Sequence, residues 1–161
     1  MLTFQELYDS YAADVYRFVL WLSGDLFQAE DITADTFVRA WTGNSAIRTE
    51  TLKAYLFTIA RNAYLEQRRK AKRQVDLNDV YPDPLIGPDQ VAEARLELQR
   101  IRRLLQDLPE VDRTAFILRV QHDLPYAEIA RILELSLSAS KVKVHRVRKK
   151  LLVARLGEEV T

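Results

Sequence analysis

Six basic side chains occupy ten consecutive positions near the end of the chain, between Lys141 and Lys150. Lysine and arginine are charged hydrogen-bond donors, so a cluster of them is suited to binding phosphates or other anions. The whole chain of 161 residues carries a formal charge of only +1. The positive charge is therefore gathered locally, which indicates a polyanionic partner at this segment.

The basic cluster fits one face of an amphipathic helix that begins after Ser136. Helical spacing puts Ser140, Val144, Val147 and Leu151 on an inward face. An α-helix fits the major groove of DNA, and the outward face has the donors to read it. We predict that Lys143, Arg148 and Lys150 bind phosphates, which position a helix without reading sequence. The outward face holds Ser138, Val142, His145, Arg146 and Lys149, and the donors of Lys141, His145 and Arg146 suit base edges or phosphates. The predicted contacts of this helix with DNA are Ser138, Lys141, Val142, Lys143, His145, Arg146 and Lys149.

The segment before this helix strengthens the DNA-binding interpretation. "LPYAEIARIL" predicts a short helix, with Pro125 tolerated at its start, and "ELS" predicts a tight turn. A short helix, a turn of a few residues and a longer basic helix form a helix-turn-helix. Without this context, the basic helix could simply be a solvated helix that closes a bundle.

A second basic block lies at residues 51–75, where seven bases accompany a single acid. Tyr55 and Asn62 interleave with the arginines of this helix, an arrangement suited to unstacked bases and the strand that carries them. Phe57 and Tyr64 are expected in the core instead. The candidate nucleic-acid contacts of this helix are Tyr55, Arg61, Asn62, Arg68 and Arg69.

No catalytic constellation stands out in the sequence. Glu30, Asp31 and Asp35 gather on one predicted helix, but no cysteine or phosphate-binding loop accompanies them. The only two histidines, His122 and His145, lack a further set of ligands. We therefore expect no metal, no cofactor and no enzymatic activity, and we interpret the carboxylates as a solvated face or a docking surface for a basic partner.

The fold class follows from the apolar periodicity, which is helical almost throughout. Thr3 and Glu6 form a capping-box pattern, and Gly43 is a plausible helix stop. Residues 74–88 hold three of the five prolines and break the pattern. We predict an all-α protein with two small helical domains, residues 1–73 and 89–161, joined by a flexible linker at 74–88.

Targeting signals are not evident in the sequence. The first residues, "MLTFQELYDSY", are acidic and amphipathic, so they do not resemble a signal peptide. No apolar run approaches the length of a membrane span. We expect a cytoplasmic protein without direct membrane insertion.

Three motifs in order resemble the extracytoplasmic-function (ECF) sigma factors of bacterial RNA polymerase. "QAEDITADTFVRAW" resembles the polymerase-binding helix of sigma region two. "LKAYLFTIARNAYLEQRRKAKR" resembles the helix that meets the −10 element. "LPEVDRTAFILRVQHDLPYAEIARILELSLSASKVKVHRVRKKL" resembles region four, the helix-turn-helix that binds the −35 element. The resemblance covers nearly the whole chain.

The resemblance implies a promoter-specificity factor that is not an enzyme. Region two would dock on the clamp helices of the polymerase β′ subunit, and region four would also touch the β flap. The loop "GNSAIRTET" would capture a flipped base of the −10 element, and the acidic linker would thread toward the active-site channel. An anti-sigma factor, often membrane-anchored, is an expected partner that could recruit the protein to the membrane. The implied polymerase contacts are Glu30, Asp31, Ala34, Asp35 and Val38, and the implied −10 loop contacts are Asn44 and Ser45.

The chain departs from the family pattern at three places. The usual Gln-Glu of region two is Ala34-Asp35, and the usual turn glycine is Glu134. The usual Gly-Thr-Val of the recognition helix is Ser138-Ala139-Ser140, which puts a serine at an inward position. We expect Ser140 to bond back to the chain.

Two other functions remain open at the level of sequence. An ordinary helix-turn-helix regulator would bind DNA, commonly as a dimer, without joining polymerase. A helical adaptor would use its basic faces to bind acidic proteins. Joining core polymerase distinguishes a sigma factor from both.

Overall fold

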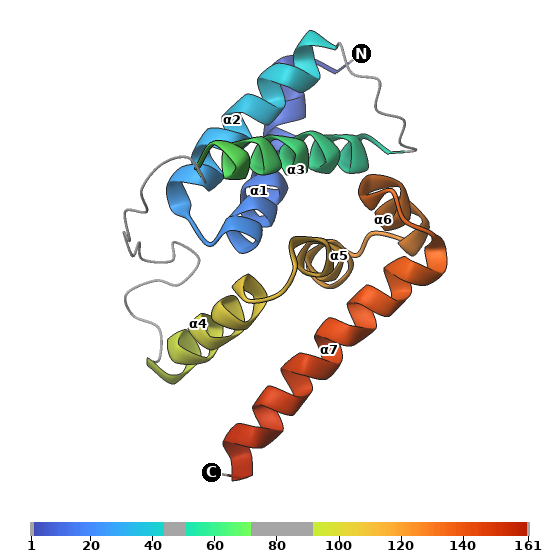
Figure 1. Ribbon diagram of the computed structural model, residues 1–161. Helices are drawn as coiled ribbons and strands as arrows, with labels where there is room; N and C mark the ends of the chain where they lie inside the picture. Colours follow the sequence, from blue (N-terminus) through green and yellow to red (C-terminus); the bar gives the residue numbers. More distant parts are fainter. Residues whose placement is uncertain (1, 44–50, 72–91, 161) are drawn as a thin grey trace. The chain divides into compact units, whose positions relative to one another are not determined.

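The protein consists of two compact units, unit 1 (Met1–Asp83) and unit 2 (Pro84–Thr161). The computed structural model describes residues 2–43, 51–71 and 92–160, and its side chains within the last range from 96 to 155. This part of the chain contains seven helices and no strand, which confirms the all-α prediction with two helical units (Figure 1). The predicted linker, 74–88, lies outside the described residues, so the exact domain borders stay a prediction.

Unit 1 is a bundle of three helices in which α1 contacts both α2 and α3, and α2 contacts α3 (Figure 1). The predicted capping box starts α1: Thr3 Oγ1 accepts from the Glu6 amide at 3.1 Å, and Glu6 Oε2 accepts from the Thr3 amide at 3.0 Å. Gly43 ends α2 with a φ of 74°, as the sequence predicts. The helices are α1 (Phe4–Ser23), α2 (Leu26–Thr42) and α3 (Leu52–Ala71).

The core of unit 1 forms where the apolar faces of these helices meet. Phe18 of α1 and Phe57 of α3 are fully buried, with ring centroids 4.9 Å apart. Phe37 of α2 is also buried. Burial of such rings supplies much of the stabilisation of a small helical domain. Helical spacing groups Trp41 with the apolar residues of α2, but its side chain is 52% exposed and packs edge-on against Phe4.

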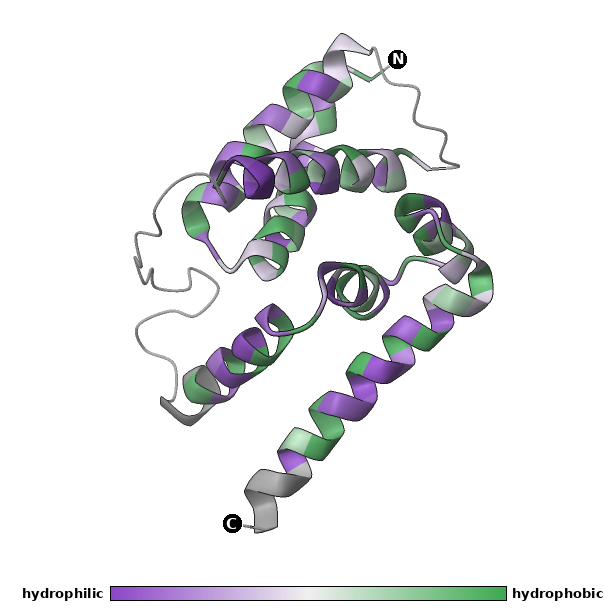
Figure 2. Cartoon of the chain, in the orientation of Figure 1, coloured by the Kyte–Doolittle hydropathy of each residue, from purple (hydrophilic) through white to green (hydrophobic). Residues whose placement is uncertain are grey.

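Unit 2 places the predicted helix-turn-helix against a further pair of helices. Helix α5 contacts α4, α6 and α7, and α6 contacts α7. Green and purple residues intermix along α7 in Figure 2, as expected for an amphipathic helix. The helices are α4 (Ala92–Gln106), α5 (Glu110–Val120), α6 (Tyr126–Leu133) and α7 (Leu137–Val160).

The buried Arg113 joins α4 to α5. Its guanidinium is almost inaccessible to solvent and donates from Nη1 to the carbonyl oxygens of Leu108 at 2.9 Å and Leu105 at 3.3 Å. These carbonyls belong to the last turn of α4 and the residues just after it. A cation is favourable at a helix C-terminus, where carbonyl groups have no partner within the helix.

Candidate nucleic-acid interface

The turn between α6 and α7 keeps its shape without a glycine. Glu134 ends α6 in the left-handed region, with φ 55° and ψ 48°. Its amide donates to the carbonyl groups of Ala130 and Arg131, so the turn retains the hydrogen bonds of a helix C-cap. For a residue other than glycine this backbone conformation costs roughly 1–2 kcal/mol, because Cβ comes close to the following carbonyl oxygen.

Ser136 starts α7, as the sequence predicts. Its hydroxyl oxygen accepts from the Ala139 amide at 3.1 Å, and Ser140 Oγ donates to the Ser136 carbonyl at 3.0 Å. The inward serine therefore bonds back to the chain, as expected. Val144 and Val147 continue the same inward face and are fully buried. The packing of this face on α5 and α6 fixes which side chains α7 turns to solvent.

The outward face of α7 is open to solvent over most of the predicted contact residues. Arg146 and His145 are exposed, and Val142 is 46% exposed in the middle of the face. An apolar side chain among donors suits contact with the thymine methyl group. The exposed residues of the predicted −35 set are Ser138, Lys141, Val142, His145, Arg146 and Lys149.

Lys143 differs from the other residues of this set. Its ammonium group lies 3.1 Å from Asp112 Oδ1 on α5, and its side chain is only 23% exposed. Asp112 itself is buried. The structure thus gives Lys143 a partner within unit 2, which the sequence did not reveal.

The helix α3 presents the second predicted set of nucleic-acid contacts. Phe57 and Tyr64 are buried, as the sequence predicts. Asn62 is exposed, whereas Tyr55 is half-buried. Arg61 is half-buried, and Arg68 and Arg69 are exposed near the C-terminal end of the helix. The predicted −10 loop residues Asn44 and Ser45 lie outside the described residues.

Arg68 combines exposure with a contact to the core. Its guanidinium carbon lies 5.7 Å from the centroid of the Tyr64 ring, within the range of a cation–π interaction. Tyr64 is buried and therefore held in place. This contact orients a cation at the surface, which reduces the freedom that Arg68 would lose on binding an anion.

The predicted polymerase-binding face of α2 is exposed along several helical turns. Glu30, Asp31, Ala34 and Val38 are exposed, and Asp35 is half-buried. Spacings of three and four residues put Asp31, Ala34, Asp35 and Val38 on one stripe. Val38 is 57% exposed, so the stripe offers an apolar surface beside its carboxylates.

The two aspartates of this stripe are bonded to neighbours that the sequence did not indicate. Asp31 Oδ2 accepts from Gln67 Nε2 at 2.7 Å. Arg39 contacts Asp35 at 2.9 Å and Glu66 on α3 at 3.1 Å. The hydrogen bond to Glu66, assisted by Asp35, raises the pKa of Arg39 above its usual value against the opposing effect of desolvation. Together these contacts join α2 to α3 beside the stripe.

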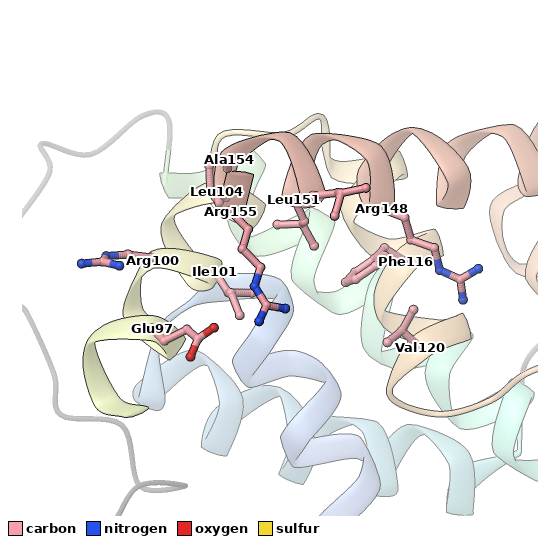
Figure 3. A pocket seen from close by; sticks show the side chains of 11 residues that line it. Glu97, Arg100, Ile101, Leu104, Phe116, Val120, Arg148, Leu151, Ala154 and Arg155 are labelled. Carbon is pink, nitrogen blue, oxygen red and sulfur yellow. The ribbon is translucent and has the colours of Figure 1, made fainter. Parts of the chain in front are cut away.

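An apolar groove of about 410 Å³ lies between α4, α5 and α7 (Figure 3). Basic side chains line it with one carboxylate, Glu97. This groove was not predictable from the sequence, because its walls come from three helices whose packing determines which apolar residues stay accessible. Its apolar lining is Ile101, Leu104, Phe116, Val120, Leu151, Leu152 and Ala154, and its basic lining is Arg100, Arg148 and Arg155.

Within residues 2–43, 51–71 and 92–160, no three histidine, cysteine or acidic side chains come together in a way that could hold a metal ion. None of the helices in these ranges has the length and apolar character needed to cross a membrane.

Comparison with family models matches both units. The model of Sigma-70 region 2 matches residues 7–74, which include the acidic stripe on α2 and the basic helix α3. The model of Sigma-70 region 4 matches residues 98–151, which include the helix-turn-helix. The two matches occur in the order in which the sequence motifs predict them.

Individual relatives and a solved structure give the same assignment. ECF RNA polymerase sigma factor SigM of Bacillus subtilis is 30% identical over 155 residues, covering 93% of each chain. ECF sigma factor SigL of Mycobacterium tuberculosis is 43% identical over 68 residues, 41% of this chain and 38% of that one. The crystal structure of the sigma factor RpoE with the anti-sigma factor NepR from Bartonella quintana matches with a TM-score of 0.76. That match has 28% identity and covers 92% of this chain and 93% of RpoE.

These similarities extend over both units, so they do not favour a regulator that acts without polymerase. The order of the motifs, the two matched regions and the match to SigM over 93% of each chain agree. The chain belongs to the ECF RNA polymerase sigma factors, the transcription initiation factors that direct RNA polymerase to promoters.

Proposed function

We propose that the outward face of α7 reads the −35 element in the major groove. The observation that carries this proposal is that the face of α7 from Ser138 to Lys149 is exposed, while Val144 and Val147 on the opposite face are buried. Arg146 and His145 lie on this face and are suited to base edges, whereas Lys149 is suited to a phosphate. Lys143 is the weakest member of the set, because its ammonium group is held by Asp112.

The −10 element is the proposed ligand of α3. Asn62 is exposed with Arg68 and Arg69 one to two turns further along the helix. An amide group can pair with the edge of an unstacked base, and the arginines can hold the adjoining phosphates. Asn44 and Ser45 would capture the flipped base, which costs least to extrude where the duplex is already opening.

The acidic stripe on α2 is the proposed contact with the β′ clamp helices of core polymerase. Exposed Val38 and Ala34 beside Asp31 and Asp35 give the mixture of apolar and charged surface typical of a protein interface. Arg39 and Gln67 hold the two aspartates in place, so their carboxylates are oriented before the partner arrives. This orientation reduces the entropy lost on binding.

The apolar groove of unit 2 is the proposed contact with the β flap. A groove with an apolar floor accepts the apolar face of an amphipathic helix. Its basic rim, which includes Arg148 and Arg155, favours a helix with acidic flanks (Figure 3).

Regulation by an anti-sigma factor is also proposed. The similar RpoE chain was solved with the anti-sigma factor NepR, and the match covers both units. A protein of this kind would cover the surfaces needed for polymerase, and a membrane-anchored one would hold this chain at the membrane. The chain itself would act in the cytoplasm as a binding factor, without catalysing a reaction.

Run-off transcription with purified core polymerase on a fragmented genomic template tests the proposal. Discrete transcripts that need this protein, and whose start sites share upstream elements, would support it. Transcripts that are unaffected by changes in the outward face of α7 would contradict the assignment of that face to the −35 element. Co-elution with core polymerase without any transcript would contradict promoter recognition while leaving polymerase binding intact.

A further inference from the structure

The groove between α4, α5 and α7 has the size and the lining of a small-molecule site. Its volume is about 410 Å³, and most of the side chains that line it are apolar. Pockets that bind small ligands are typically of this size, apolar over most of their surface and supplied with a few polar groups that orient the ligand. The groove therefore suits a ligand with an apolar body, and its charged side chains determine which head group that ligand carries.

Two arginines of α7 supply positive charge along one wall of the groove. Arg148 and Arg155 both line it and are both exposed. Seven positions in a helix correspond to about two turns, or roughly 10 Å along the axis, so the two side chains project from the same face. Leu151 and Leu152 lie between them and also line the groove. This wall is therefore an aliphatic surface with a cation at each end.

The two ends of the groove differ in charge. Glu97 and Arg100 of α4 lie at one end in Figure 3, whereas Arg148 lies at the other end, on the side of Val120. The Glu97 carboxylate repels an anion that approaches the first end. The guanidinium of Arg148 has no ion pair or hydrogen bond among the described residues. The second end therefore favours an anionic head group, and a guanidinium can bind a carboxylate through two parallel hydrogen bonds.

An apolar path leads away from Arg148 through the groove. Phe116 of α5 is only 9% exposed, and Ile101 and Leu104 of α4 are half-buried. Val120 and Leu152 are 47% and 57% exposed, so much of their apolar surface is in contact with water. Covering such surface is favourable, and an alkyl chain is flexible enough to follow it between two helices.

We propose that this groove binds a medium-chain fatty acid, with its carboxylate on Arg148 and its alkyl chain between α4 and α7. The charge of Arg148 matches the head group, and the aliphatic and aromatic lining matches the chain. The site itself rests on the groove alone. Its consequence rests on the proposed function: because the same groove is the proposed contact with the β flap, a bound fatty acid would weaken the binding of core polymerase.

An NMR titration of the ¹⁵N-labelled full chain with decanoate, kept below the concentration at which it forms micelles, tests the site. Shifts of the Ile101, Leu104 and Val120 amides locate the ligand, and their concentration dependence gives its affinity. From octanoate to decanoate, binding should tighten by about 4-fold for each methylene group that the groove buries. An affinity that does not depend on chain length would overturn the apolar part of the site.

The Arg148→Gln variant tests the head group. It should weaken the binding of decanoate by about 5- to 10-fold, because the charged hydrogen bonds to the carboxylate are lost. Decanol has the same alkyl chain without a charge, so its affinity should change by less than about 2-fold. Unchanged binding of decanol also shows that the groove is intact in the variant. Equal effects on decanoate and decanol would overturn the assignment of the carboxylate to Arg148.

A pair of neighbouring variants tests the location. Leu152 and Val153 are both exposed aliphatic residues of α7, but only Leu152 lines this groove. Leu152→Ser should weaken the binding of decanoate by about 5-fold, because part of the surface that the alkyl chain covers is lost. Val153→Ser is the matched control and should have little effect. Equal effects of the two variants would place the ligand elsewhere and overturn the site.

Binding of core polymerase separates this inference from the proposed function. Decanoate should weaken that binding to the unchanged chain, and less so to Arg148→Gln. If decanoate occupies the groove but polymerase binding is unaffected, the contact of the groove with the β flap is wrong and the fatty acid site stands. If decanoate does not bind, while Leu152→Ser weakens the binding of core polymerase, the fatty acid site alone is wrong.

Discussion

Lys143 Nζ on α7 lies 3.1 Å from Asp112 Oδ1 on α5, although the two residues are 31 positions apart in the sequence. This ion pair connects α7 to α5. Asp112 is buried, and its carboxylate side chain retains only 8% exposure. Lys143 therefore has a structural role in addition to any contact with DNA.

Lys143→Ala should destabilise unit 2 by about 2 kcal/mol, because it leaves a buried carboxylate without its cation. Lys149→Ala, on the exposed face of the same helix, should change stability by less than about 0.5 kcal/mol. Amide hydrogen exchange in α5 and α7 measures this free energy for unit 2 separately from unit 1. The double variant Asp112→Asn, Lys143→Met should recover much of the loss. Equal stability of the two single lysine variants would show that the ion pair contributes nothing.

Glu134→Gly should stabilise unit 2 by about 1 kcal/mol. Glycine adopts the left-handed conformation of this position without the steric strain that a Cβ brings. The gain is partly offset, because glycine also has more freedom in the unfolded chain. Ala139→Gly, inside the first turn of α7, should instead cost roughly 0.5–1 kcal/mol. Exchange rates of the α6 and α7 amides report both effects, and destabilisation by Glu134→Gly would indicate that the glutamate side chain makes a favourable contact.

Arg146→Ala should lower transcription from the cognate promoter about 10-fold, while affinity for core polymerase changes little. The residue is exposed on the outward face of α7, and loss of a good base contact costs roughly 1–3 kcal/mol. Run-off transcription and co-elution with core polymerase measure the two properties. Arg103→Ala on α4 is the control for loss of charge. Equal loss of transcription and of polymerase binding would contradict the assignment of Arg146 to DNA.

Asn62→Ala should reduce promoter opening by about 10-fold with no change in binding to a −35 duplex. The amide of this exposed side chain is the proposed partner of an unstacked base, and such contacts form only once the base has left the duplex. Permanganate reactivity of the −10 thymines follows the opening. On a template with a premelted −10 element, the defect should shrink. Gln5→Ala on α1 is the control, and a defect in duplex binding would contradict the prediction.

Asp31→Asn should weaken binding to core polymerase by about 3- to 10-fold. The substitution removes the charge from the α2 stripe but leaves an oxygen that can still accept from Gln67 Nε2. Asp9→Asn removes one charge from α1 and should leave the affinity unchanged. Competition between the variants for a limiting amount of core polymerase gives the ratio of their affinities. If Asp31→Asn binds core polymerase with unchanged affinity, Asp31 is not part of the polymerase interface.

Local features of the fold were predictable because their partners are close in sequence. The capping box of Thr3 and Glu6, the stop at Gly43 and the Ser136 cap all join residues within four positions. Helical periodicity likewise identified the inward face of α7, including Val144 and Val147.

The contacts between helices were not predictable from one sequence. The pairs Lys143–Asp112 and Arg39–Glu66 join residues 31 and 27 positions apart, and periodicity says nothing about which exposed charges meet. Tyr126 was assigned only as part of a short helix, because its cation partners, Arg119 and Lys141, come from two other helices. Trp41 continues the apolar spacing of α2, but it is the next-to-last residue of that helix and its ring is left half-exposed.

Arg113 has a consequence for how the groove of unit 2 meets a partner. By bonding the carbonyl groups of Leu105 and Leu108, it sets the angle at which α4 leaves α5, and hence the distance between two walls of the groove. The conformational entropy needed to fix this geometry is lost when the protein folds, so it is not lost again when a partner binds. The proposed helix of the β flap would therefore bind a groove whose shape is already set, and its affinity would depend on how well its apolar face fits that shape.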